Sequence, residues 1–131
     1  MSFIQSNIPV YLPDSAYTLD SSDSGKLMLV PVLASNRVLT LPAAANNAGL
    51  HYRFMAIGTL SHSLTITPAA TGLVNGLLIT NNAGTLAGVA KTAANTVVMT
   101  ATAVLGDWVD CYCDGTAWHV NGMTQVTAGL S

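Results

Sequence analysis

The stretch Gly106–Val120, "GDWVDCYCDGTAWHV", gathers two cysteines, one histidine, three aspartates and two tryptophans within fifteen residues. Such a composition fits a metal site, an active site or a β-hairpin whose side chains mainly pack. Asp114-Gly115 is a strong hairpin signal, because both residues tolerate the positive φ angles of a type I′ turn. We therefore expect a hairpin with these two residues as its loop.

A loop of that length fixes which side chains share a face, because side chains alternate along a strand. One predicted face is mostly apolar and holds both cysteines: Val109, Cys111, Cys113, Thr116, Trp118 and Val120. The other carries larger polar and aromatic groups: Trp108, Asp110, Tyr112, Ala117, His119 and Asn121. Zinc needs its ligands on one side, so we expect no metal site and reduced cysteines that pack as small hydrophobes.

The second face has three interpretations. This register places Asp110 opposite His119, and a carboxylate can orient an imidazole for base catalysis. The pair can also be a simple cross-strand polar contact beside exposed aromatic rings. Large aromatics around a polar pair are equally typical of an interface core or a ligand-stacking patch. We favour an interaction surface of Trp108, Asp110, Tyr112 and His119 over a catalytic site.

Composition indicates one domain with few charges. The chain has 131 residues, of which 50% are hydrophobic and only 8% charged, where an ordinary soluble domain has about 25% charged residues. A surface built from Thr, Ser, Asn and Ala would explain the deficit. We favour burial of much of the surface in an assembly, since obligate interfaces resemble a core cut in half.

Charge and hydropathy also exclude several classes of partner. The net charge is −2 and the four basic residues are scattered, so no basic stripe is available for nucleic acid. The first residues lack the basic and continuous apolar segments of a signal peptide. No stretch reaches the roughly 18 apolar residues of a membrane span. We expect a protein made in the cytoplasm that binds neither nucleic acid nor membrane.

Strand signals dominate the chain. They fall at residues 16–20, 26–33, 37–41, 51–57, 63–67, 76–80, 96–102, 108–113 and 117–122. Short strands spaced roughly 8–12 residues apart, with turn residues between them, predict an antiparallel β-sandwich or barrel. We expect about eight strands in a single domain over residues 14–131.

The first thirteen residues are predicted to form an extended arm, because prolines at positions 9 and 13 disfavour a helix. The arm carries four large apolar side chains, Phe3, Ile4, Ile8 and Val10. We expect them to contact a partner subunit. The alternative is a first strand tucked into its own sheet.

The segment "DSSDSGK" (20–26) partly matches two ligand-binding loops. It lacks the leading glycine and the Ser or Thr after Lys26 that a phosphate loop needs. It also lacks the bidentate glutamate of an EF-hand, because Pro31 holds that position. We expect a loop in which Asp and Ser side chains bond nearby backbone and Gly25 supplies a positive φ. Weak calcium binding is the alternative.

No set of residues assembles a nucleophile, a base and an oxyanion hole. There is no G-x-S-x-G sequence, and His51 and His62 have no acidic neighbour in sequence. Arg37 and Arg53 fall in strand-like segments and are expected to pair with aspartates or to project outward. We therefore expect no enzyme and no cofactor.

Four segments together resemble small virion structural proteins of tailed bacteriophages. They are "DSSDSGK" (20–26), "RVLTLPA" (37–43), "GLHYRF" (49–54) and "GDWVDCYCDGTAWHVNG" (106–122). Such sequences occur in head-decoration proteins and in β-rich tail-fibre modules. The resemblance implies an antiparallel, jelly-roll-like fold in a homo-oligomer, most often a trimer, without catalysis.

The resemblance also implies which residues define the fold. The matching positions are Asp23, Gly25, Lys26, Leu41, Pro42, Tyr52, Phe54, Gly106, Asp107, Trp108, Asp114, Gly115 and Trp118. The chain departs from the pattern at Cys111 and Cys113, where branched or hydroxyl residues are commoner.

The expected function is that of a capsid decoration protein, which binds the major capsid protein on the virion surface and stabilises the head. The arm over residues 1–13 is the expected contact with the capsid or a neighbouring subunit. One alternative is a tail-fibre or spike module that stacks a host glycan on Trp108 and Tyr112. Another is a minor capsid or penton protein with a single jelly roll.

Overall fold

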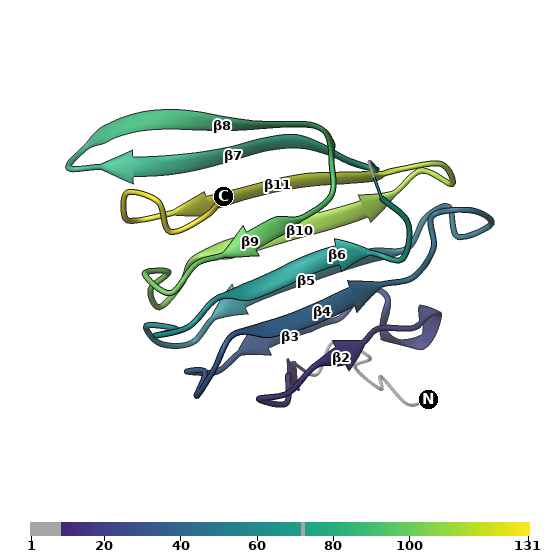
Figure 1. Cartoon of the computed structure of the whole chain (residues 1–131), viewed down its shortest axis with the longest axis horizontal. Coiled ribbons are helices and arrows are strands. Elements are labelled where there is room, and N and C mark those ends of the chain that lie inside the picture. Colours follow the sequence, from purple (N-terminus) through teal and green to yellow (C-terminus); the bar gives the residue numbers. More distant parts are fainter. Residues whose placement is uncertain (1–8, 72) are drawn as a thin grey trace, which may run out of the picture.

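The computed structural model describes residues 9–71 and 73–131, which form two β-sheets and no α-helix (Figure 1). The large sheet contains, in spatial order, β1 (Val10–Tyr11), β3 (Leu27–Val30), β5 (His51–Ala56), β10 (Trp108–Cys113), β11 (Trp118–Thr124), β7 (Val74–Asn82) and β8 (Thr85–Ala94). The small sheet contains β2 (Tyr17–Thr18), β4 (Arg37–Leu41), β6 (Leu64–Pro68) and β9 (Val97–Met99). The all-β fold and its β-sandwich architecture are confirmed, with eleven strands described where about eight were expected. Among the described residues, no helix is long and apolar enough to cross a membrane.

From β1 to β6 the chain winds as a coil. Successive strands alternate between the sheets, and each lies parallel to the strand two places earlier. Parallel strands need a crossover connection, and here the intervening strand in the opposite sheet provides it. This winding differs from the antiparallel, jelly-roll-like arrangement that was expected. The alternation of apolar and polar residues indicates where a strand lies, but not which strand it pairs with.

The second half of the chain is built from hairpins. β7 and β8 are joined by a two-residue loop, Ala83 and Gly84, whose φ angles of 50° and 91° are those of a type I′ turn. The chain then crosses to β9 and returns as β10 and β11, which fill the gap between β5 and β7. The sequence did not predict β8, because Ala and Gly are weak strand formers.

The β10–β11 hairpin has a four-residue loop, residues 114–117, and the predicted two-residue loop is wrong. The Asp114 carboxylate accepts bonds from the backbone N–H groups of Thr116 and Ala117, both at 2.7 Å, and only Gly115 has a positive φ, 96°. Cys113 therefore lies opposite Trp118. The register moves by two residues, an even number, so the predicted division into a core face and an outer face is confirmed for the strand residues. It is wrong for Thr116, which was predicted on the core face and is exposed in the loop.

The core lies between the sheets around three fully buried rings, Trp118, Tyr52 and Phe54. Their polar atoms find backbone partners, as buried aromatic groups require. The Trp118 indole N–H donates to the Pro42 carbonyl at 3.1 Å, and the Tyr52 hydroxyl donates to the Asp20 carbonyl at 2.7 Å. Burial raises the pKa of Tyr52 to about 12.

Asp107 lies directly before β10 and is fully buried. Its carboxylate accepts bonds from the backbone N–H groups of Val104 and Gln125, both at 2.9 Å, and from the Thr124 hydroxyl at 2.7 Å. These bonds tie the entry to β10 to the end of β11. Asp107 thus has a structural role.

The loop at "DSSDSGK" forms the short helix η1 (Ser21–Asp23). The Asp20 side chain accepts from the backbone N–H of Ser22 at 2.8 Å, and the Asp23 side chain accepts from that of Asp20 at 3.2 Å. Gly25 has a φ of 82°. The expected backbone-bonding loop is confirmed.

The N-terminal boundary needs a correction. Phe3, Ile4 and Ile8 lie outside the described residues. Val10, however, belongs to β1, which pairs with β3, and the following Leu12 is buried in the core. The described end of the predicted arm is therefore an edge strand of the domain's own sheet, and the domain begins before residue 14.

Candidate interaction face of the large sheet

The described residues bring together few groups suited to covalent or metal chemistry. No three His, Cys, Asp or Glu side chains among them are placed to hold a metal ion. Cys111 and Cys113 are free thiols buried in the core. Burial raises the pKa of Cys111, which disfavours the reactive thiolate.

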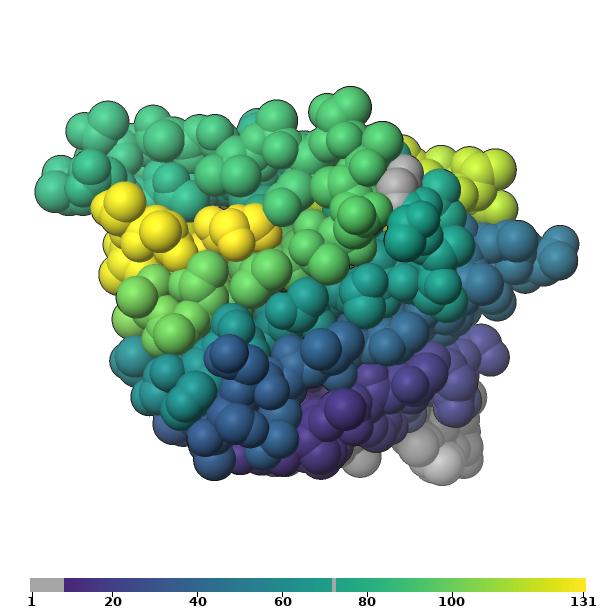
Figure 2. Space-filling view, viewed as in Figure 1, coloured from purple at the N-terminus to yellow at the C-terminus, as the bar shows by residue number. Residues whose placement is uncertain are grey.

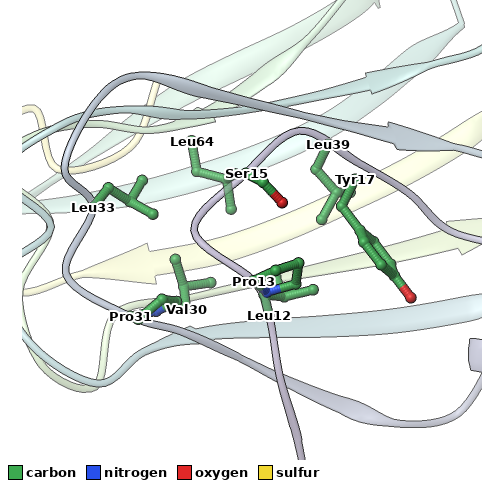
Figure 3. A pocket seen from close by; sticks show the side chains of 9 residues that line it. All are labelled: Leu12, Pro13, Ser15, Tyr17, Val30, Pro31, Leu33, Leu39 and Leu64. Atoms are coloured by element: carbon green, nitrogen blue, oxygen red, sulfur yellow. The ribbon is translucent and has the colours of Figure 1, made fainter.

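The hollow between the two sheets near β2 is small and apolar (Figure 3). Its volume is about 230 Å³, counted with the solvent at its mouth, and ligand pockets usually reach about 300–1,000 Å³. The lining side chains are mostly aliphatic: Leu12, Pro13, Ser15, Tyr17, Val30, Pro31, Leu33, Leu39 and Leu64. The hollow therefore offers little for specific recognition.

The face of the large sheet that points away from the small sheet, here called the outer face, is richer in chemistry. The strand registers align its side chains in rows that cross the whole sheet. One row is apolar and takes one residue from each of the seven strands: Tyr11, Leu29, Met55, Trp108, Met123, Ile79 and Gly88. We call it the apolar row.

The exposure of the apolar row varies along its length. Tyr11 and Met123 are exposed, whereas Met55, Trp108 and Ile79 are half-buried. Leu29 is buried, so the row combines packed side chains with largely exposed ones.

The adjacent row centres on an ion pair. The Arg53 guanidinium of β5 donates to both carboxylate oxygens of Asp110, at 2.6 and 2.7 Å. The same guanidinium lies 4.9 Å from the centre of the Trp108 ring. Hydrogen bonding to Asp110 raises the pKa of Arg53. The Asp110 side chain is only 4% exposed, so its charge is covered by its partner.

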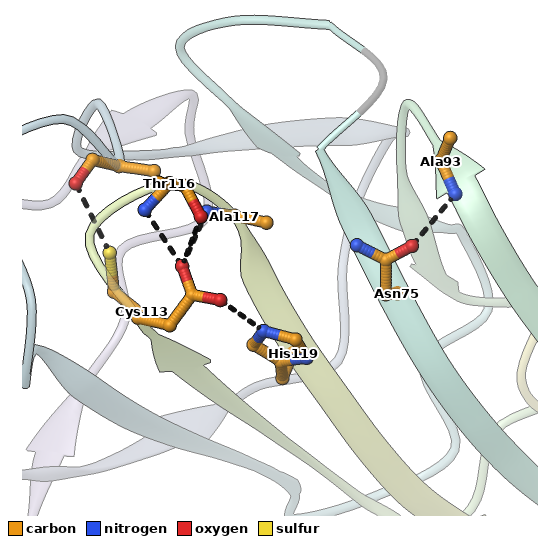
Figure 4. Close-up of polar contacts among 8 residues, drawn as sticks. Asn75, Ala93, Cys113, Thr116, Ala117 and His119 are labelled. Atoms are coloured by element: carbon orange, nitrogen blue, oxygen red, sulfur yellow. Dashed lines mark hydrogen bonds and ion pairs between the residues drawn. The ribbon is translucent and has the colours of Figure 1, made fainter.

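The predicted pairing of Asp110 with His119 is wrong. Asp110 lies opposite Asn121, because the longer loop shifts β11 by two residues. His119 instead contacts the loop carboxylate, with 2.6 Å between its Nε2 atom and Asp114 Oδ2 (Figure 4). The bond from His119 lowers the pKa of Asp114.

A third row holds the ring side chains of His51, Tyr112 and His119. The His51 and Tyr112 rings stack with centroids 4.8 Å apart and planes at 1°. The negative charge of Asp110 raises the pKa of Tyr112, whose hydroxyl lies 3.4 Å from Asp110 Oδ2. Beyond His119, the Asn75 side chain accepts a bond from the Ala93 backbone N–H at 2.9 Å (Figure 4).

The four residues predicted as an interaction surface, Trp108, Asp110, Tyr112 and His119, thus all lie on the outer face. Sequence reasoning missed the neighbours that complete it: His51, Arg53, Met55, Leu77, Ile79 and Met123. Their alternation within strands was visible in the sequence, but the order of the strands was not.

No protein-family model matches the sequence, and no curated protein matches it either. The outer face is the surface of the described domain with the clearest features for recognition. Arg53 and Asp110 are paired with each other, and the Trp108 and Tyr112 rings already contact neighbours, while the apolar row stays partly exposed. Aromatics, Met and Arg are the side chains enriched in protein interfaces.

Proposed function

We propose that this chain is a non-catalytic structural protein that assembles through the outer face of its large sheet. The apolar row across the seven strands carries the proposal. Contiguous apolar patches on monomers are usually limited to a few hundred Å² and often mark interaction sites. The Arg53–Asp110 ion pair beside the row is already formed. Burying this part of the face therefore leaves neither charge without a partner.

We further propose that the assembly is a virion and that the chain decorates a phage capsid as a homo-oligomer bound to the major capsid protein. The resemblance of four sequence segments to small virion proteins supports the biological setting. The low content of charged residues, 8%, supports extensive burial on the particle. Many modest contacts repeated over a symmetric lattice give strong overall binding.

The outer face favours a protein partner over a host glycan. The Trp108 ring is partly covered by Arg53, and the Tyr112 ring stacks on His51. Trp108 and Tyr112 lie about 13 Å apart along β10, judged from the strand rise. One sugar ring therefore cannot stack on both.

Labelling of virions tests the biological part of the proposal. Gold-labelled antibody to the chain should cover the heads of the phage particles densely. Label at the tail tip would instead assign the chain to a fibre, and label at the vertices alone would assign it to a penton. Particles without label would contradict a virion role.

Two matched variants test the outer face itself. Met123→Lys places a charge in the apolar row, whereas Val38→Lys places one on the small sheet, and the two residues are similarly exposed at 44% and 46%. Heads lacking the chain should bind the Val38→Lys protein normally and the Met123→Lys protein at least about tenfold more weakly. Equal binding of both proteins would contradict docking through the outer face.

A further inference from the structure

β8 is a long strand with one open edge. It is the last strand of the large sheet and, among the described residues, pairs with β7 alone (Figure 1). In the space-filling view the β7–β8 hairpin forms the upper margin of the molecule (Figure 2). No residue of β8 is buried, and Leu86 is 64% exposed.

The other described sheet edges are too short or already covered. β1 and β2 have two residues each. β9 has three, and its Val98 exchanges two backbone bonds with Ser131, of 2.7 and 3.0 Å. Within the described part of the chain, no other open edge is as long as β8. The edge that matches it in length is therefore β8 of a second copy.

Over residues 85–91, β8 also lacks most of the devices that keep sheet edges apart, because its register shift against β7 falls beyond Lys91. Natural edges are usually short, charged, bulged or interrupted by proline. β8 has ten residues, no proline and one charged residue, Lys91. Small side chains such as Ala87, Gly88 and Ala90 leave its backbone accessible.

The direction of its free backbone groups follows from the hairpin. Asn82 and Thr85 flank the type I′ loop and form a hydrogen-bonded pair. Bonded and non-bonded pairs alternate along an antiparallel ladder. The N–H and C=O groups of Leu86, Gly88 and Ala90 therefore point away from β7, toward the open edge.

We propose that β8 pairs antiparallel with β8 of a second copy about a twofold axis at Gly88. Leu86 then lies opposite Ala90 of the second copy, and Lys91 lies opposite its Thr85, so no like charges meet. The paired segment, residues 85–91, ends before Ala93, whose φ of 47° interrupts the strand.

A twofold axis at Gly88 would also make the outer faces of the two copies continuous. Gly88 is the last member of the apolar row. A twofold axis perpendicular to the sheet keeps both outer faces on the same side, so the two apolar rows run on as one across the paired sheets. The contact goes beyond the proposed function, because it rests on the strand edge and not on docking to a capsid. A dimer contact also differs from the trimer that the resemblance implies.

Two double variants that differ only in the sign of one charge test this register. Leu86→Lys with Ala90→Lys places lysines opposite each other twice across the axis. Leu86→Lys with Ala90→Glu places opposite charges there, which favours pairing. Both positions are exposed, so folding of the monomer should be unaffected, as circular dichroism can verify.

Light scattering after size exclusion should show an even number of 13.5 kDa chains for the wild type. The Lys/Lys variant should dissociate to half that mass at the same concentration, with association weakened about tenfold or more. The Lys/Glu variant should keep the wild-type mass. An odd number of chains in the wild type, or equal masses for both variants, would overturn the proposal.

Head binding separates this inference from the proposed function. A Lys/Lys variant that dissociates in solution but still coats heads would support both proposals and make pairing dispensable for decoration. Wild-type dimers together with unlabelled virions would support edge pairing and contradict the decoration role.

Discussion

The two hairpins of the large sheet share a local design but have different surroundings. β10–β11 has β5 on one side and β7 on the other, and buries Trp118, Cys111 and Val109 completely. Among the described strands β7–β8 has a neighbour only on the β7 side, and no residue of β8 is fully buried, although Val89 and Ala94 pack partly against the core. Burial in this sheet is therefore decided by neighbouring strands more than by the hairpin itself.

The largest expected difference in stability is between substitutions of one side chain in each hairpin. Trp118→Ala removes a fully buried ring and should lower the free energy of unfolding by about 3–5 kcal/mol. Leu86→Ala on β8 should change it by less than about 0.5 kcal/mol in the monomer. Urea unfolding followed by fluorescence or circular dichroism measures both. Similar losses would contradict the exposed position of Leu86 on β8.

Two glycines of the β7–β8 hairpin should respond differently to substitution by alanine. Gly76 has a φ of 143°, and an added Cβ would lie 1.8 Å from the Val120 carbonyl oxygen of β11. Gly76→Ala should therefore destabilise the fold by about 2–4 kcal/mol.

A Cβ added at Gly88 would lie 3.0 Å from Leu77 Cδ1, which is the end of a flexible side chain and can move away. Gly88→Ala should cost less than about 1 kcal/mol. Equal destabilisation by the two substitutions in thermal unfolding would contradict the close approach of β7 to β11.

The smallest expected effect concerns the loop of β10–β11 at low pH. The pKa of Asp114 is lowered by its bond from His119, so the ionised form stabilises the fold above the ordinary carboxyl pKa of about 3.9. That stabilisation is lost as the pH falls through the lowered value. His119→Ala should therefore reduce the fall in Tm below about pH 4, whereas His51→Ala, which removes a ring stack, should leave it unchanged. Parallel curves for wild type and His119→Ala would exclude the linkage.

The sequence predicted what depends on local alternation. The burial of Cys111 and Cys113 beside Trp118 follows from the two-residue period of a strand, and it survives the error in the loop because the register moved by an even number. The loop itself was mispredicted because Asp114 uses its carboxylate to bond Thr116 and Ala117. Asp-Gly permits both loops, and the tertiary setting selects one.

Long-range features were not accessible from the sequence. Arg53 and Asp110 are 57 positions apart and meet because β10 enters the sheet beside β5. The local pattern instead suggested His119 as the partner, from the same hairpin. The parallel coil was missed for a similar reason, since alternating residues look the same whichever direction the neighbouring strand runs.

The central place of β10 and β11 has a consequence for synthesis. These strands lie in the middle of the large sheet, yet the ribosome makes them after β5 and β7, the strands on either side. Until residue 124 has left the exit tunnel, the nascent chain carries two open inner edges. Strand edges exposed in this way can join wrongly with those of another chain. Slow translation near the end of the message should therefore lower the yield of soluble protein, whereas equal slowing before β7 should have little effect.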